Sequence, residues 1–359
     1  MLIESQESTP QGGAKESRVR RQMQPAFPDN PVLVRCWRGG RVESIHRGSW
    51  VLMDANGEVI DGQGAFDFPV YARSSTKALQ ALPLIESGAA DAFEFSKKEL
   101  ALALASHRGE KIHTQVVGGL LSRLGMGTDD LRCGSQMPWE SEVRHQLRVS
   151  GEQPSALHNN CSGKHASFLA LAKHLGDDLQ SYIDPASNGQ KLVHQTMLEM
   201  TGVQPEELTT ALDGCSAPTF RLPLKNLALA FARFANPGGL SSSRREACER
   251  LADAVGENPD LIGGSRNQIC SAIARVTGGR LFPKFGAEAV YILGERGGDR
   301  ALAIKMDDGQ ERWLHTVTLH LLRRFGLAKD QELSALSAWA AGPETNYAGL
   351  VVGRTEVVE

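Results

Sequence analysis

The 359-residue sequence lacks several features that would assign it to a broad class at once. No apolar run approaches the roughly 18 residues that a membrane-spanning helix requires, which argues against an integral membrane protein. Lys and Arg number 39 against 42 Asp and Glu, so the formal net charge is −3. This charge provides no basic field for nucleic acid and no polybasic patch for a membrane surface. We therefore expect small molecules and other copies of the chain as partners.

Cysteine is sparse, and its pattern is not that of a disulfide framework. The six cysteines are widely spread: Cys36, Cys133, Cys161, Cys215, Cys248 and Cys270. The N-terminal stretch carries charges, including Arg18 and Arg21, and lacks the apolar segment of a signal peptide. We interpret residues 1–30 as a polar, mostly disordered extension. Free thiols in a cytoplasmic protein are therefore favoured over disulfides.

Strand patterns occur at both ends of the remaining chain. Residues 32–34 and 50–53 form short apolar runs, and Asn56-Gly57 before residues 58–60 predicts a hairpin. Two further strands are predicted at residues 289–293 and 301–306, separated by a Gly-Gly-Asp turn. Helices are predicted after them, at residues 312–325 and 332–341.

Between these ends, nearly every segment from residue 74 to about 276 has helical periodicity. The predicted helices are residues 75–86, 111–124, 165–175, 190–200, 224–234, 244–255 and 268–276, while residues 99–105 fit helix or strand. We therefore predict an α+β fold, in which N- and C-terminal strands form one antiparallel sheet with flanking helices. The expected lobes are a sheet lobe (31–73 and 279–359) and a helical lobe (74–278), with a site in the cleft between them.

Ser74-Ser75-Thr76-Lys77 is an S-x-x-K motif at the start of a predicted helix. Residues three apart lie on one helical face, so Lys77 can reach the Ser74 hydroxyl. A neutral lysine, its pKa lowered by burial or nearby positive charge, can take the proton of a serine nucleophile. The alternative is that Ser74 caps the helix and Lys77 is solvated.

Two other polar segments lie near predicted element ends. Ser106 could be a second hydroxyl in a proton relay, oriented by His107, or the segment could be a simple helix end and turn. Lys284 could face a cleft, stabilise negative charge and depress the pKa of Lys77. Its alternative is a solvated lysine in a turn.

Cys161 and Cys215 are candidate metal ligands, because thiolates are soft ligands for zinc. Lys164 would be an unusual third ligand and would have to be neutral. No C-x-x-C or H-E-x-x-H pattern supports a conventional site. Two small buried thiols without a metal remain the alternative.

Six segments, taken in order, resemble the bacterial L-asparaginase II family, also called the Rhizobium-type or class 3 asparaginases. They are residues 73–77 (RSSTK), 105–107 (ASH), 131–134 (LRCG), 160–165 (NCSGKH), 213–218 (DGCSAP) and 284–287 (KFGA). The resemblance covers about residues 32–353. It implies a fold like that of serine β-lactamases and glutaminases, hydrolysis of L-asparagine to L-aspartate and ammonia, a homodimer, and a zinc site close to the active site.

The resemblance also implies roles for individual residues. Ser74 would be the nucleophile and Lys77 its base, while Ser106 and Lys284 would form a second pair that relays protons. The metal ligands would be Cys161, Lys164 and Cys215, and the substrate pocket would be lined by Arg73, His165 and Asp213. Arg73 and Asp213 suit the α-carboxylate and α-ammonium of an amino acid. We expect acylation at Ser74, because its lysine lies one turn away on the same helix.

Two other functions fit parts of the sequence. A glutaminase or β-lactamase-like serine hydrolase would also use S-x-x-K, but Phe285 stands where the K-T-G motif of such sites has a threonine. A non-catalytic zinc or amino-acid binding protein could share the fold. Retention of both serine–lysine pairs argues against it.

Overall fold

The computed structural model describes residues 27–358. Its main sheet is antiparallel and has eight strands in the order β10-β11-β1-β2-β9-β8-β7, with β3 paired to β2. The strands are β1 (Val32–Arg38), β2 (Arg41–Asp54), β3 (Val59–Gln63), β7 (Leu281–Gly286), β8 (Val290–Glu295), β9 (Arg300–Met306), β10 (Pro343–Thr345) and β11 (Val351–Val357). The predicted α+β fold, with N- and C-terminal strands in one sheet, is confirmed. Most of the predicted extension lies outside the described residues.

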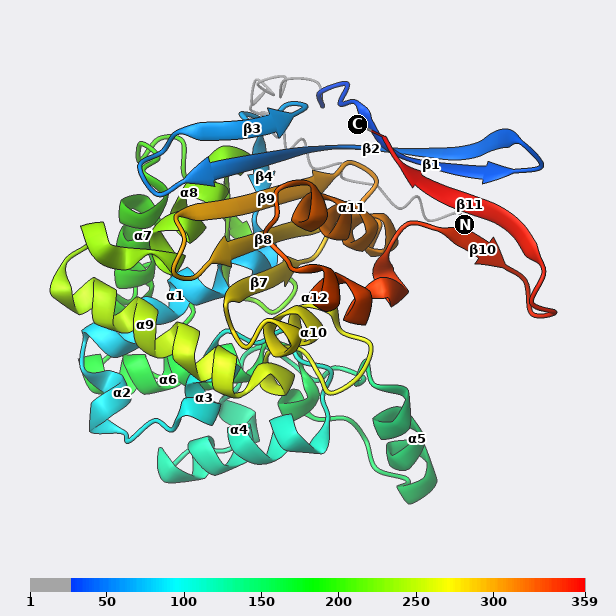
Figure 1. Cartoon of the computed structure of the whole chain (residues 1–359). Coiled ribbons are helices and arrows are strands. Elements are labelled where there is room, and N and C mark those ends of the chain that lie inside the picture. Colours follow the sequence, from blue (N-terminus) through cyan, green and yellow to red (C-terminus); the bar gives the residue numbers. More distant parts are fainter. Residues whose placement is uncertain (1–26, 359) are drawn as a thin grey trace, which may run out of the picture.

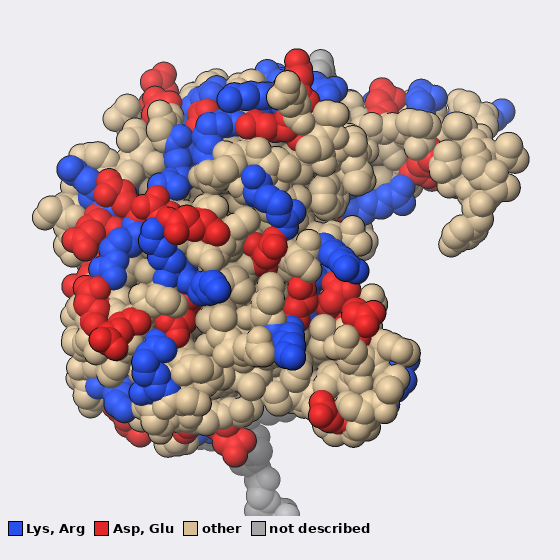
Figure 2. Space-filling view, turned by 60° about the horizontal axis from the view of Figure 1, so that its bottom comes forward, with Lys and Arg blue, Asp and Glu red and all other residues tan. Residues whose placement is uncertain are grey.

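Figure 1 shows helices on both faces of this sheet and an arm that projects from the body. α8 (Leu224–Ala235) contacts Gly294 on one face, and Phe325, at the end of α11 (Glu311–Arg324), packs against Trp50 on the other. The arm consists of β1, β10, β11 and the first half of β2. On the face seen in Figure 2, basic and acidic side chains are interspersed. No helix within residues 27–358 is both long and apolar enough to cross a membrane.

The predicted local elements mostly occur where the sequence placed them. Asn56 and Gly57 lie in the hairpin between β2 and β3, as the turn chemistry predicts. The ambiguous stretch at residues 99–105 is largely helix. The helices between residues 77 and 276 are α1 (Lys77–Glu86), α2 (Ala89–Ala92), α3 (Lys97–Ala103), α4 (Lys111–Arg123), α5 (Ser141–Ser150), α6 (Ser162–Leu175), α7 (Asn188–Thr201), α8, α9 (Ser242–Glu257) and α10 (Ile269–Val276).

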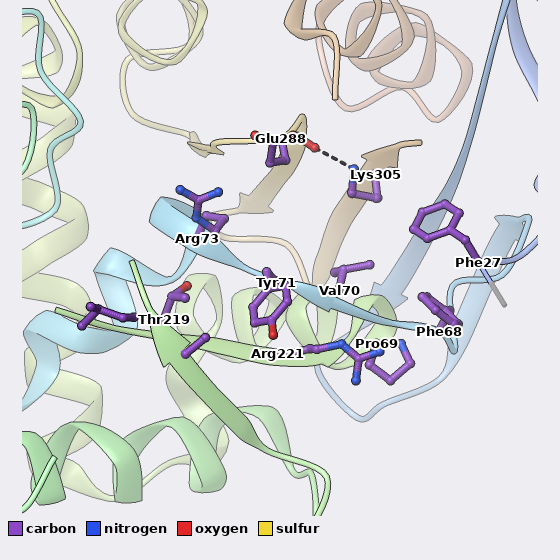
Figure 3. A pocket seen from close by; sticks show the side chains of 12 residues that line it. Phe27, Phe68, Pro69, Val70, Tyr71, Arg73, Thr219, Arg221, Glu288 and Lys305 are labelled. Atoms are coloured by element: carbon purple, nitrogen blue, oxygen red, sulfur yellow. Dashed lines mark hydrogen bonds between the residues drawn. The ribbon is translucent and has the colours of Figure 1, made fainter. Parts of the chain in front are cut away.

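A small second sheet is the main departure from the sequence prediction. It pairs β4 (Pro69–Tyr71) with β6 (Pro218–Pro223), and β6 with β5 (Thr209–Leu212). No strand was predicted for β5 or β6, which lie between the predicted helices at residues 190–200 and 224–234. These strands are short, and β4 lies more than a hundred residues away, so local periodicity carries little signal for them. Figure 3 shows β4 and β6 side by side.

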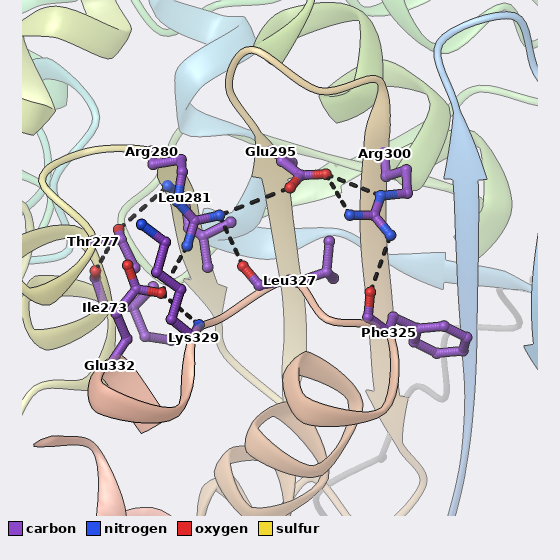
Figure 4. A network of polar contacts seen from close by, with 10 residues as sticks. All are labelled: Ile273, Thr277, Arg280, Leu281, Glu295, Arg300, Phe325, Leu327, Lys329 and Glu332. Carbon is purple, nitrogen blue, oxygen red and sulfur yellow. Dashed lines mark hydrogen bonds and ion pairs between the residues drawn. The ribbon is translucent and has the colours of Figure 1, made fainter. Parts of the chain in front are cut away.

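A polar network fixes the C-terminal helices against β7–β9 (Figure 4). Arg280 donates to Glu332 at 2.7 Å, on α12 (Asp330–Ala335), and to the carbonyl of Leu327 at 2.8 Å. Glu295 accepts from Arg300 at 2.9 Å and lies 3.7 Å from Arg280. The network anchors the sheet edge that carries Lys284.

Candidate active site

Lys77 begins α1 and is almost fully buried, with an exposed fraction of 1%. Its Nζ donates to Ser106 Oγ at 3.0 Å and to the carbonyl of Ala105. The S-x-x-K spacing predicts contact with Ser74, yet the amine points to Ser106 on another segment. Ser74 is half-buried, and its hydroxyl has no hydrogen-bond partner within residues 27–358.

Lys284 approaches the same serine from β7. Strand alternation directs Phe285 toward His315 on α11, with ring centroids 6.4 Å apart, and Lys284 to the opposite face of the strand, toward Ser106. Lys284 Nζ lies 2.9 Å from Ser106 Oγ and 2.9 Å from the carbonyl of Phe285. The structure therefore brings Lys77, Ser106 and Lys284 together.

Gly286 explains how β7 comes so close to the Ser74 segment. A Cβ at this position would lie 2.7 Å from the Ala72 carbonyl oxygen, closer than real Cβ atoms approach, and 3.0 Å from Ser75 N. The glycine of the K-F-G segment thus allows the 3₁₀ turn at Arg73–Thr76 to lie directly on the strand.

Burial and the neighbouring Lys77 charge lower the pKa of Lys284 to about 7. Near neutral pH this amine exists in both forms. When neutral, it can accept the Ser106 hydroxyl proton while Lys77 donates to the same oxygen. A buried serine between two amines of this kind can pass a proton in either direction.

Ser106 is held from both sides by backbone contacts. Its N–H donates to the carbonyl of Ile262 at 3.0 Å, and the N–H of His107 donates to the carbonyl of Asn160 at 3.2 Å. The His107 side chain bonds the Ser162 hydroxyl at 2.8 Å. The suggested orienting contact from His107 to the Ser106 hydroxyl is therefore not formed.

The candidate metal ligands Cys161, Lys164 and Cys215 lie together beside this cluster, all buried. Lys164 Nζ lies 3.2 Å from Cys215 Sγ. A hydrogen bond from Cys215 lowers the pKa of the Cys161 thiol well below its usual value. Burial disfavours a charge on Lys164, but Cys215 and Cys161 outweigh this and raise its pKa. Within residues 27–358, no three His, Cys, Asp or Glu side chains converge on a metal position, so a metal here would need the lysine nitrogen.

Gly163 permits the close approach of α6 to α3. A Cβ there would lie 2.3 Å from the Leu102 carbonyl oxygen. Cys161 and Lys164 flank this contact on the first turn of α6, so the glycine sets their distance from Ser106.

Arg73, which directly precedes Ser74, forms an ion pair with Asp213. Arg73 Nε donates to Asp213 Oδ1 at 2.8 Å. Burial opposes ionisation of Asp213, but the Arg73 charge and the Gly214 N–H hold its pKa below the ordinary value. Arg73 (φ 51°) and Ser216 (φ 69°) both adopt left-handed backbone conformations, which in non-glycine residues cluster at functional sites.

His165 is a buried residue of α6. Its ring contacts Tyr182, a residue that the sequence prediction missed. The Tyr182 hydroxyl accepts from the Arg132 N–H at 2.8 Å and lies 2.7 Å from His165 Nδ1. Tyr182 can donate its proton to Nδ1, and in that tautomer the ring hydrogen lies on Nε2. Nε2 is buried without a hydrogen-bond partner among the described residues. Burial and the charges of Lys164 and Lys77 lower the pKa of His165 well below its usual value, so the neutral ring is favoured. No sequence pattern around Tyr182, in the loop before α7, marks this contact.

Comparison with known proteins gives one match across nearly the whole chain. The family model described as L-asparaginase II matches residues 34–357. A search of curated proteins finds no match.

Proposed function

Because the chain belongs to the L-asparaginase II family, we propose that its buried serine–lysine cluster hydrolyses the side-chain amide of L-asparagine to L-aspartate and ammonia. Family membership implies an amidohydrolase that acts on asparagine. The observation that carries the finer proposal is the pair of lysine amines on one serine hydroxyl, within 3.0 Å and 2.9 Å of Ser106 Oγ. This arrangement can shuttle the protons that amide hydrolysis requires.

Ser74 is the proposed nucleophile and Ser106 the relay. Ser74 is half-buried with an unpaired hydroxyl, whereas Ser106 is buried and engaged by both lysines. Ser74 Oγ attacks the amide carbon, and its proton passes into the Lys77–Ser106–Lys284 relay. The relay returns a proton to the leaving nitrogen as the C–N bond breaks, so ammonia departs and an aspartyl ester remains on Ser74. Water then hydrolyses the ester, releasing aspartate and restoring the serine.

The substrate's charged groups are assigned to Arg73 and Asp213. Arg73 uses only Nε for Asp213, and its two Nη groups have no partner within residues 27–358. They can bind the α-carboxylate, while the Asp213 carboxylate attracts the α-ammonium. The Nε2–H of His165 supplies a further neutral donor for substrate or water.

Zinc is proposed at Cys161, Lys164 and Cys215. Cys215 contacts both Cys161 and Lys164, and two thiols and an amine are sulfur and nitrogen donors of the kind that zinc prefers; Lys164 must lose its proton to bind. Bound zinc would supply a fixed positive charge at this end of the site.

A homodimer is proposed on the basis of the projecting arm. Its surface exposes Tyr347, Leu350 and Val351 at the β10–β11 end, and Val42 and Ile45 on β2, with β1 between β11 and β2. Apolar side chains gathered on one projection are typical of an interface.

Turnover by the purified protein tests the function. Ammonia release is measured with L-asparagine and L-glutamine, and ring opening of a chromogenic β-lactam is followed by its absorbance. We expect turnover of asparagine above the other two. Preference for glutamine or the β-lactam would instead assign a related serine hydrolase. Bound metal with no ammonia release from a folded sample would favour the non-catalytic binding protein.

A further inference from the structure

A cavity of about 530 Å³ opens beside Arg73, and the proposed reaction of asparagine alone leaves it unused. Its floor is one face of the small sheet, where β4 and β6 pair in antiparallel register with Tyr71 opposite Arg221. The Ala72 N–H donates to the carbonyl of Phe220, so the same register continues and sets Thr219 beside Arg73. Figure 3 shows Arg73 and Thr219 at one end of the cavity and Phe68 at the other.

We call this cavity the groove. At its Arg73 end, several hydrogen-bonding atoms lack partners. Thr219 is 3% exposed, lines the groove, and its Oγ1 has no hydrogen-bond partner among the described residues. The Arg73 Nη groups are likewise unpaired. Buried polar atoms are nearly always paired in folded proteins, so an unpaired hydroxyl beside the unpaired Nη groups of Arg73 indicates a missing polar ligand.

The middle of the groove combines a second cation with apolar walls. The Arg221 side chain makes no hydrogen bond or ion pair within residues 27–358, and its Cζ lies 5.7 Å from the centre of the Phe68 ring. Tyr71 is 45% exposed and lines the same space. An anion with an adjacent apolar group fits this environment.

We propose that the groove is a subsite for the rest of a short peptide whose N-terminal asparagine occupies the site at Ser74. This inference rests on the proposed function and extends it to a second substrate class. The peptide's first carbonyl accepts from Arg73 and Thr219, its next side chain packs against Tyr71 and Phe68, and its terminal carboxylate pairs with Arg221. The reaction is the same side-chain hydrolysis: asparaginyl peptide and water give aspartyl peptide and ammonia.

The charges and spacing favour asparagine at the N-terminal end. An N-terminal residue keeps its α-ammonium for Asp213, whereas a C-terminal one would leave that carboxylate without a cation from the ligand. Arg73 and Arg221 are two strand positions apart in register, about 7 Å. Each extended residue spans about 3.3–3.6 Å, so one or two further residues carry the terminal carboxylate to Arg221.

Steady-state kinetics with L-asparagine, L-asparaginyl-glycine and L-asparaginyl-L-phenylalanine test the subsite. We expect wild-type protein to release ammonia from all three, with the lowest KM among the dipeptides for the phenylalanine one. Arg221→Ala should raise the KM for both dipeptides about tenfold, and Tyr71→Ala should raise it for the phenylalanine dipeptide alone. Both variants should leave asparagine kinetics within about twofold. Arg148→Ala, an exposed arginine on α5, is the matched control and should change nothing.

The possible failures are distinguishable. Turnover of asparagine with no turnover of either dipeptide, or equal effects of Arg221→Ala on all three substrates, overturns the subsite and leaves the asparaginase. No ammonia from any substrate overturns the proposed function itself. In that case calorimetry with L-aspartyl-L-phenylalanine still decides the subsite, because binding needs no turnover. The subsite proposal is overturned if wild-type protein does not bind this dipeptide, or if Arg221→Ala binds it as tightly as wild type does.

Discussion

Lys284 lies with its Nζ 2.9 Å from Ser106 Oγ, although 178 residues separate them in the chain. The amine of Lys77, on α1, contacts the same oxygen. Two lysines on one hydroxyl cannot both carry a full charge without cost, and burial adds to that cost. The relay therefore contains one amine that can accept a proton near neutral pH.

The first prediction is a pH dependence. Since the pKa of Lys284 is lowered to about 7, the amine is protonated below that pH and neutral above it. Only the neutral form accepts a proton, so kcat/KM for asparagine should rise as pH increases through about 7. Lys284→Met should lose about 10²–10⁴-fold in kcat/KM. A wild-type profile that stays level between about pH 5.5 and 8.5 would contradict the relay.

The two serines should differ in how their loss affects the reaction. Ser74→Ala removes the nucleophile and should lower kcat by at least about 10³-fold. Ser106→Ala interrupts the relay and should slow formation of the aspartyl ester while leaving its location unchanged. Mass spectrometry of acid-quenched protein can map the ester. An ester on the peptide that contains Ser106 would reverse the two roles.

The sequence predicted the fold well where the signal is local. Helical periodicity gave α1, α4, α7 and α8 to within a few residues, and Asn56-Gly57 gave the hairpin. The small sheet was not predicted, because β4 and β6 are far apart in the sequence and pair only in the folded protein. For the same reason the S-x-x-K spacing identified Lys77 but assigned its amine to Ser74. The observed acceptor, Ser106, comes from the segment after α3, and no local rule predicts which of two serines a buried amine will select.

Metal binding should depend on all three proposed ligands. Wild-type protein purified with zinc should retain it after dialysis, while Cys215→Ser and Lys164→Met should lose it by elemental analysis. Affinity should fall as pH decreases, because protons compete for the thiolate of Cys161 and for Lys164. Cys248→Ala removes a buried thiol on α9 and serves as the control. Equal zinc content in all four proteins would place the metal elsewhere.

The proposed dimer should dissociate when the arm becomes charged. Val351 on β11 is 68% exposed, and Val351→Asp would place a carboxylate in the apolar interface. Sedimentation equilibrium should show a dimer for wild type and a monomer for this variant. Val149 on α5 is similarly exposed, at 73%, and Val149→Asp should remain dimeric. If the wild-type protein is a monomer at micromolar concentration, the proposed dimer is wrong.

Two glycine substitutions should have opposite effects on stability. Gly163→Ala would push a methyl group to 2.3 Å from the backbone oxygen of Leu102, so α6 and α3 must separate. We expect a loss of about 1–3 kcal/mol in the free energy of unfolding, together with lower activity, because Cys161 and Lys164 move with the helix. Gly119 lies on the exposed face of α4, and a Cβ there meets nothing within 4 Å. Gly119→Ala should stabilise the protein by up to about 1 kcal/mol through helix propensity alone. Chemical denaturation of both variants measures the difference, and a neutral Gly163→Ala would mean that the α3–α6 contact does not need its glycine.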